Sequence, residues 1–317
     1  MKHTIKGLFA ASAFAASVIA TSTGAWAQDP KQCQTVRLSD VGWLDISSTN
    51  GVANFLLTSL GYDVDLKTLS VPVTYQSLQN NDIDIFLGNW MPAQQKLIKP
   101  YMDKGTVEHV KKNLDGAKYT LAVPTYLADK GLKSFADIAK FKDELDGQIL
   151  GLESGNQGNA KILKMIETDT FGLKDFSVTP SSEAGMLSAA LRRNRREQPY
   201  VMLAWEPHPM NVQLDLTYLD GGDDWFGPNY GGATVHTVTR AGYSDLCPNV
   251  GKLLSQLTYS LKMENEIMGL IAEGEEPDVA AKAWLQKHPD ALEGWLKDVM
   301  TRDGNDGLSK VRQALAE

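Results

Sequence analysis

Short apolar runs alternate with stretches of helical spacing along most of the chain. Runs typical of buried strands occupy residues 35–38, 64–71, 83–87, 118–124, 148–152 and 200–204. Apolar residues recur at the three- and four-residue spacing of helices over residues 52–60, 74–79, 93–101, 135–145 and 159–165, and over most of the chain from residue 243. This alternation predicts an α/β fold with largely parallel strand pairing.

Three further segments complete the expected arrangement. Residues 107–114 have an extended pattern, and residues 212–219 are predicted to carry the chain back toward the first part of the sheet. Residues 47–49 are Ser-Ser-Thr, whose hydroxyl groups can cap the helix that ends at Leu60. The sheet is therefore expected to have two strands that cross between its first and second halves.

Three of the seven tryptophans directly follow predicted strands and precede turn-forming residues. They are Trp43, Trp90 and Trp205. Ligands of open α/β sheets bind outside the carboxyl ends of the strands, so the three indoles could converge on one pocket. Aromatic faces attract a quaternary ammonium, which has no N–H to donate. A purely structural role in the core is the alternative, and helical spacing explains Trp284 and Trp295 in that way.

Three polar or amphipathic side chains stand close to these tryptophans or to other strand ends. Asp45 follows Trp43 by two residues, where a carboxylate would favour a cation or serve only as a helix N-terminal charge. Asn156 lies in a glycine-rich turn at residues 153–159 that opens a helix, and it is the side chain there expected to contact a ligand. Tyr119 begins the first crossover strand and could face the cleft or the core.

The first 27 residues have the pattern of a secretory signal peptide. Lys2 and Lys6 precede an uncharged run that is too short to span a membrane, and Ala25 and Ala27 fit a cleavage site after Ala27. The mature chain is then expected to start at Gln28, to be soluble, and to reside in the periplasm or outside the cell. Its loss of two lysines changes the formal net charge from −8 to −10, which argues against nucleic acid and anionic membranes as partners.

No motif for catalysis, a metal or a cofactor stands out. The five histidines have no paired metal-ligand spacing, and the chain has no GxSxG sequence around a serine nucleophile. Cys33 and Cys247 are the only cysteines, and an even count in an exported protein usually means that they are paired. We therefore predict no catalytic residues, no metal and no cofactor.

About 290 mature residues exceed the usual size of one domain, so two domains are expected. If the cysteines pair, the N-terminal region and the region near residue 247 share a lobe, and the middle of the chain is inserted. The predicted boundaries are 28–118 plus 216–317 for the first lobe and 119–215 for the second. Two lobes joined by two crossover strands are typical of hinge-closing binding proteins.

The chain resembles the choline and glycine-betaine substrate-binding proteins of ABC importers. The resemblance covers the mature chain and rests on residues 42–45, 80–85, 88–92, 119, 153–156 and 204–208. It implies a two-lobed type II periplasmic binding protein fold, a Cys33–Cys247 disulfide, and delivery of the ligand to a membrane permease and ATPase. A monomer is expected.

By the same resemblance, Trp43, Trp90, Tyr119 and Trp205 are the walls of an aromatic box around a trimethylammonium group. Asp45 and Asn156 would bind the other end of the ligand. Choline is favoured over glycine betaine, because Asp45 would repel a carboxylate and no Arg or Lys stands in the pocket segments to receive one. Glycine betaine bound by backbone N–H groups of residues 155–158 stays an alternative, and a periplasmic enzyme acting on a choline ester is a more remote one.

Overall fold

The computed structural model describes residue 1 and residues 28–317. The predicted signal peptide, apart from its first residue, therefore lies outside the described residues. Within the described part, no helix is long and apolar enough to cross a membrane.

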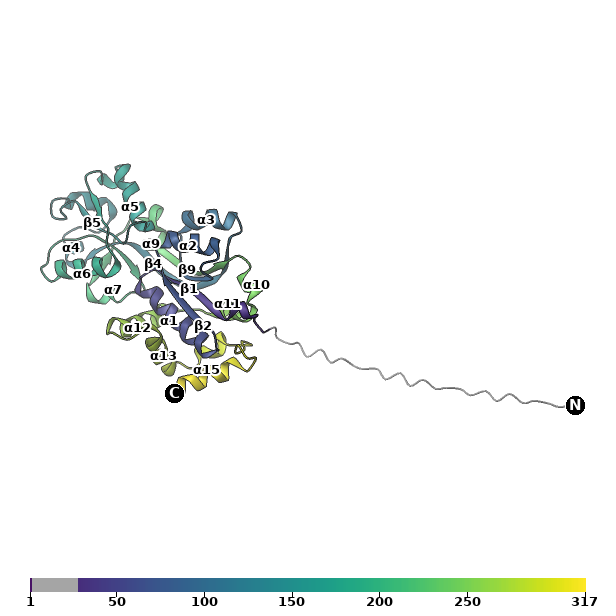
Figure 1. Cartoon of the computed structure of the whole chain (residues 1–317). Coiled ribbons are helices and arrows are strands. Elements are labelled where there is room, and N and C mark those ends of the chain that lie inside the picture. The colour runs from purple at the N-terminus through teal and green to yellow at the C-terminus, as the bar shows by residue number, and fades with distance from the viewer. Residues whose placement is uncertain (2–27) are drawn as a thin grey trace.

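One mixed sheet of nine strands runs through the whole molecule, in the order β2-β1-β3-β9-β4-β7-β5-β6 with β8 beside β4. The strands are β1 (Thr35–Asp40), β2 (Asp63–Thr68), β3 (Ile85–Met91), β4 (Val107–Pro124), β5 (Gln148–Leu150), β6 (Ser177–Thr179), β7 (Met202–Glu206), β8 (Leu216–Tyr218) and β9 (Gly232–Arg240). In Figure 1, β1 and β2 lie in one half of the molecule and β5 lies in the other.

Helices cover both halves of the sheet. The first half carries α1 (Leu44–Ser59), α2 (Val71–Asn80), α3 (Gln95–Asp103), α10 (Tyr243–Leu246), α11 (Pro248–Gln256), α12 (Leu261–Ala272), α13 (Pro277–Lys287), α14 (Ala291–Trp295), α15 (Gly307–Ala316) and the 3-10 helix η1 (Lys31–Cys33). The second half carries α4 (Thr125–Asp129), α5 (Gln157–Glu167), α6 (Glu183–Asn194), α7 (Met210–Gln213), α8 (Asp223–Phe226), α9 (Pro228–Gly231), η2 (Phe135–Phe141) and η3 (Thr170–Gly172). Figure 1 shows the C-terminal helices α12, α13 and α15 beside α1.

The strand β4 joins the two halves without interruption. Its residues 107–118 pair with β9, residues 118–122 pair with β7, and residues 122–124 pair with β8. The return strand is β9, which pairs with β3 and β4. The expectation that residues 212–219 carry the chain back is therefore wrong: part of this segment is helical, and β8 pairs with the far end of β4.

Strand pairing is also less parallel than the sequence pattern predicted. The pairs β1–β2, β1–β3, β5–β6 and β5–β7 are parallel, whereas β3–β9, β4–β9, β4–β7 and β4–β8 are antiparallel. The difference arises at the crossover strands, because β4 leaves the first half in one direction and β9 re-enters it in the other.

The helix α1 begins eight residues earlier than the pattern of apolar residues indicated. The predicted caps lie inside the helix, where the hydroxyl groups of Ser48 and Thr49 donate to the carbonyls of Asp45 and Ile46. Trp43 is the residue at the N-cap position, with an extended backbone. Asp45 consequently lies in the first turn of α1.

The lobe boundaries stay a prediction. The backbone N–H of Phe135 donates to the carbonyl of Asp220, and β8 pairs with β4 beyond Leu121. These contacts attach residues up to 220 to the second half and favour a boundary beyond residue 220 rather than at residue 215.

The predicted disulfide is present and ties the N-terminal 3-10 helix to the C-terminal helices. Cys33 and Cys247 are fully buried, their Cα atoms lie 5.8 Å apart, and 214 residues separate them in sequence. The bridge therefore holds the start of the chain and the segment after β9 in the same half of the molecule.

Replacing both Cys33 and Cys247 by Ala should lower the free energy of unfolding by up to roughly 5 kcal/mol, because the bridge restricts a very long loop in the unfolded chain. Urea unfolding of the parent and the double variant measures this difference. Intact mass under non-reducing conditions, after alkylation of the exported protein, should reveal no free thiol. Two alkylated cysteines in the native protein would contradict the pairing.

Candidate functional site

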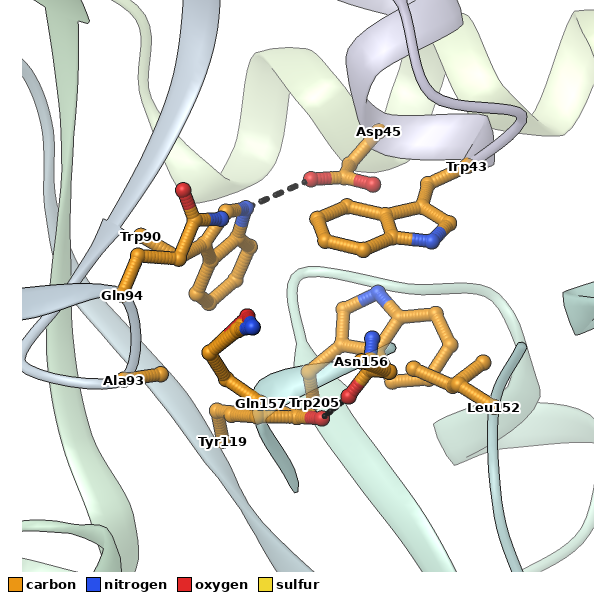
Figure 2. A pocket seen from close by; sticks show the side chains of 10 residues that line it. All are labelled: Trp43, Asp45, Trp90, Ala93, Gln94, Tyr119, Leu152, Asn156, Gln157 and Trp205. Atoms are coloured by element: carbon orange, nitrogen blue, oxygen red, sulfur yellow. Dashed lines mark hydrogen bonds between the residues drawn. The ribbon is translucent and has the colours of Figure 1, made fainter. Parts of the chain in front are cut away.

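One cavity brings together all six residues that the sequence singled out. Figure 2 shows them around it: Trp43, Asp45, Trp90, Tyr119, Asn156 and Trp205. Four lining residues were not predicted, namely Ala93, Gln94, Leu152 and Gln157. Ala93 and Gln94 follow the Trp90 turn and Gln157 follows Asn156, so proximity in sequence could have indicated three of the four.

Four aromatic rings form the larger part of the wall. The ring centroids of Trp90 and Tyr119 are 6.2 Å apart, and those of Tyr119 and Trp205 are 6.4 Å apart, with tilted and edge-on geometry. Trp43 comes from the turn before α1, and its exposed fraction of 9% is the largest of the four. In Figure 2 the Trp43 and Trp205 indoles face the cavity from the α1 side and from the opposite half.

Trp90 and Trp205 lie within strands, and not after them as the sequence pattern suggested. Trp90 pairs with Val235 across β3 and β9, and Trp205 pairs with Tyr119 across β7 and β4. Directly paired residues project to the same face of a sheet, so strand register alone places Tyr119 beside Trp205. Each strand continues for one residue beyond its tryptophan, and the turns begin at Pro92 and Pro207.

Asp45 is the one acidic side chain that lines the cavity. It is buried, and its Oδ2 accepts a hydrogen bond from the indole N–H of Trp90 at 3.0 Å. Its Oδ1 is buried without a hydrogen-bond partner among residues 28–317. Burial, and then the charge of Glu183, raise the pKa of Asp45 to about 8.

Two glutamates of the second half contact the segment that carries Trp43 and Asp45. Glu153 accepts from the indole N–H of Trp43 at 3.2 Å, and Glu183 accepts from the backbone N–H of Leu44 at 3.2 Å. No motif in the sequence pointed to either contact, because each joins residues more than a hundred positions apart. The contacts link the beginning of α1 directly to the second half of the molecule.

His208 supports both Glu183 and the Trp205 turn. Its Nδ1 accepts from the backbone N–H of Met210, so its Nε2 carries the proton and donates to Glu183 at 3.1 Å. Its ring packs edge-on against Trp205 at a centroid distance of 5.1 Å. These contacts agree with a role in holding the Trp205 turn and occupy both ring nitrogens.

Asn156 is the N-cap of α5 and also positions an aromatic wall. Its Oδ1 accepts from the Tyr119 hydroxyl at 2.7 Å (Figure 2). The same oxygen accepts from the backbone N–H of Gly158 at 2.8 Å, and the Nδ2 donates to Glu153 at 3.1 Å. A Cβ at position 158 would lie 2.1 Å from the Tyr119 hydroxyl oxygen, so only glycine fits there. The other N–H of the Asn156 amide has no hydrogen-bond partner within the described chain.

The cavity is therefore mostly apolar, with one carboxyl group and no basic side chain in its lining. Its lining contains no Lys, Arg, Ser, Thr, Cys or His. Among residues 28–317, no three His, Cys, Asp or Glu side chains gather as metal ligands. Aromatic faces around a single carboxyl group are suited to a cation that cannot donate hydrogen bonds.

A protein family matches most of the chain. The family described as the substrate binding domain of ABC-type glycine betaine transport systems covers residues 34–287. An uncharacterised protein of Chromohalobacter salexigens is 47% identical over 128 residues, which are 40% of this chain and 83% of that protein.

Solved structures with the same fold include an ABC-transporter choline-binding protein in complex with choline. It is 57% identical, with a TM-score of 0.89 over 90% of this chain and all of that chain. A lactococcal protein of the glycine betaine family, closed around glycine betaine, is 26% identical, with a TM-score of 0.76 over 83% of this chain and all of that one. The predicted α/β, two-lobed binding-protein fold is thereby confirmed.

Asn156→Ala should lower the free energy of unfolding by about 1–2 kcal/mol, because it removes a helix cap and leaves the buried Tyr119 hydroxyl without its acceptor. Asn156→Ser, which keeps a favoured N-cap oxygen and adds no charge beside Glu153, is the matched control and should lose less stability. Urea unfolding of the two variants measures the difference. Equal stability of Asn156→Ala and the parent would show that the cap and the tyrosine contact contribute nothing.

Proposed function

Because the chain belongs to the family of substrate-binding domains of ABC-type glycine betaine transport systems, we propose that it captures choline between its lobes for uptake by an ABC importer. The observation that carries this proposal is the enclosure of one buried carboxyl group by four aromatic rings. We assign the trimethylammonium group to Trp43, Trp90, Tyr119 and Trp205, and the ligand hydroxyl to Asp45 and Asn156. The free Oδ1 of Asp45 and the free amide N–H of Asn156 supply the acceptor and the donor that a hydroxyl needs.

The chemistry of the cavity favours choline over glycine betaine. The two ligands share the cationic head, and only glycine betaine ends in a carboxylate. Once the cationic head has ionised Asp45, this residue would repel that carboxylate, and no basic side chain lines the cavity to receive it. The backbone N–H of Gly158, one candidate partner for a betaine carboxylate, already donates to Asn156. The 57% identical protein, whose structure was solved in complex with choline, supports the same choice.

Glycine betaine remains the second candidate, because the family description names it and a 26% identical relative was solved with it. A choline-ester hydrolase has less support. The lining residues include no Ser, Thr, Cys or His, and both nitrogens of the nearby His208 are already hydrogen-bonded.

The remaining parts of the proposal concern location and partners. We propose that the protein works as a monomer in the periplasm, is exported by residues 1–27, and delivers choline to a membrane permease and its ATPase. It needs no cofactor for this role, since capture and release require only lobe closure and opening.

Choline should bind more tightly than glycine betaine, with a Kd in the micromolar range or below, which corresponds to about −8 kcal/mol or better. Calorimetric titration of the mature protein with both ligands measures the difference. Incubation with acetylcholine should release no choline. Equal or tighter binding of glycine betaine would overturn the choline assignment.

Replacing one wall of the aromatic box by Ala should weaken choline binding about three-fold to thirty-fold, because each cation–π contact contributes roughly 0.5–2 kcal/mol. Trp90→Ala should lose the most affinity for choline, since this change also removes the hydrogen bond to Asp45. The matched control is Trp284→Phe on α13, where the indole donates to Glu266 outside the cavity. If the variants of Trp43, Trp90 and Trp205 fold and all bind like the parent, the aromatic-box mechanism is wrong.

A further inference from the structure

We propose that choline displaces a proton from Asp45 as it binds, and that Glu183 sets the pH at which this exchange occurs. The inference rests on the proposed function, because it concerns the same cavity. It adds Glu183, which does not line the cavity, as a residue that determines the affinity for a quaternary ammonium.

The surroundings of Asp45 favour its neutral form when the cavity is empty. The side chain has a relative exposure of 2%, and its only side-chain hydrogen bond within residues 28–317 comes from Trp90. The backbone N–H groups of Ile46 and Asp45 offset the cost of burial only in part, and no basic side chain lines the cavity, so the carboxylate is disfavoured and takes up a proton instead. The raised pKa of Asp45, about 8, agrees with this geometry.

The charged neighbours of Asp45 come from several elements. Glu183 on α6 accepts from the N–H of Leu44, the residue directly before Asp45, and also from His208. These two donors stabilise a negative charge on Glu183. Since like charges disfavour a second ionisation, Glu183 raises the pKa of Asp45.

Three more acidic groups surround the start of α1. Glu153 accepts from the indole of Trp43, and Asp40 accepts from the backbone N–H of Gly42 and from the Ser47 hydroxyl. Glu264 on α12 is 3% exposed, and no side-chain hydrogen bond or ion pair engages it within residues 28–317. Burial raises the pKa of Glu264 well above its ordinary value, and the charge of Asp45 raises it further, so Glu264 stays neutral.

A quaternary ammonium replaces the proton as the positive charge beside Asp45. Its field favours the carboxylate, so it lowers the pKa of Asp45 and the proton leaves. A ligand that binds the ionised form binds more tightly as pH rises, until the empty site is itself ionised. Affinity should therefore increase up to about pH 8 and be constant above it.

Choline carries no titratable proton near neutral pH, so any proton released on binding comes from the protein. Calorimetric titration at about pH 7 in phosphate and in Tris, whose ionisation enthalpies differ, counts the released protons. We expect nearly one proton to be released for each choline bound. The Kd measured from about pH 6 to 9 should fall roughly ten-fold per pH unit below pH 8 and then level off.

Three variants test whether the released proton comes from Asp45 and whether Glu183 sets the pH of its release. Asp45→Asn should bind choline more weakly, release no proton and show no pH dependence in this range. Glu183→Gln keeps an acceptor for the N–H of Leu44 but removes the charge, so the plateau should begin at a lower pH and fewer protons should be released at about pH 7. Glu264→Gln is the matched control and should behave like the parent, because it replaces one neutral group by another.

The outcomes separate this inference from the proposed function. If choline binds the parent with the same Kd across the range and with no dependence of the heat on buffer, proton displacement is wrong while the function stands. Release that persists in Asp45→Asn, or disappears in Glu264→Gln, would also overturn the assignment to Asp45. A parent-like pH profile in Glu183→Gln would remove Glu183 from the mechanism, even if that variant is less stable. No choline binding at any pH would overturn the proposed function itself.

Discussion

The hydrogen bond from the Trp90 indole to the Asp45 carboxyl group is the contact around which the cavity is arranged. Asp45 comes from the first turn of α1 and Trp90 from β3, so the bond holds the helix start against a central strand. It directs the indole N–H away from the cavity and leaves the ring face for a ligand. It also occupies one carboxyl oxygen and leaves the other available. A cation that cannot donate hydrogen bonds could then contact the ring face of Trp90 and the carboxyl group of Asp45 together.

The second half supplies the remaining walls of the cavity and also brings further carboxyl groups close to it. Glu153 and Glu183 bring carboxyl groups of the second half to Trp43 and Leu44 of the first. Each contact satisfies a donor, but together they place carboxyl groups near Asp45 without a basic side chain in the lining. Without a positive charge in the cavity, this arrangement opposes closure by like-charge repulsion. A bound cation, or a proton on Asp45, relieves the repulsion, so ligand charge and lobe closure are coupled.

The sequence predicted the aromatic and polar wall well, because large rings after apolar runs mark strand ends and turns. It placed Trp43, Trp90 and Trp205 at one site, and the structure gathers them in one cavity with Tyr119. The antiparallel return through β9 was missed, since apolar spacing does not give strand direction. Glu183 was missed for a different reason: on the surface of a helix an acidic residue is ordinary, and only the fold brings it to Leu44. Whether the six predicted residues bind ligand stays a prediction.

The two crossover strands, β4 and β9, run next to Tyr119, one wall of the aromatic box. The pairing of β4 with β9 is irregular between Leu114 and Ala117, just before Tyr119. Directly before β9, Gly231 has a φ of +74°, and a Cβ there would lie 2.2 Å from the Tyr119 carbonyl oxygen. Glycine is therefore required both by the backbone conformation and by the close approach. Because a hinge absorbs backbone changes at a few such positions, a bend here would move Tyr119 relative to Trp90 of the first half. Such a bend would close the lobes and assemble the box in one motion, and a ligand that fits the closed box would stabilise the closed protein by its difference in affinity for the two states.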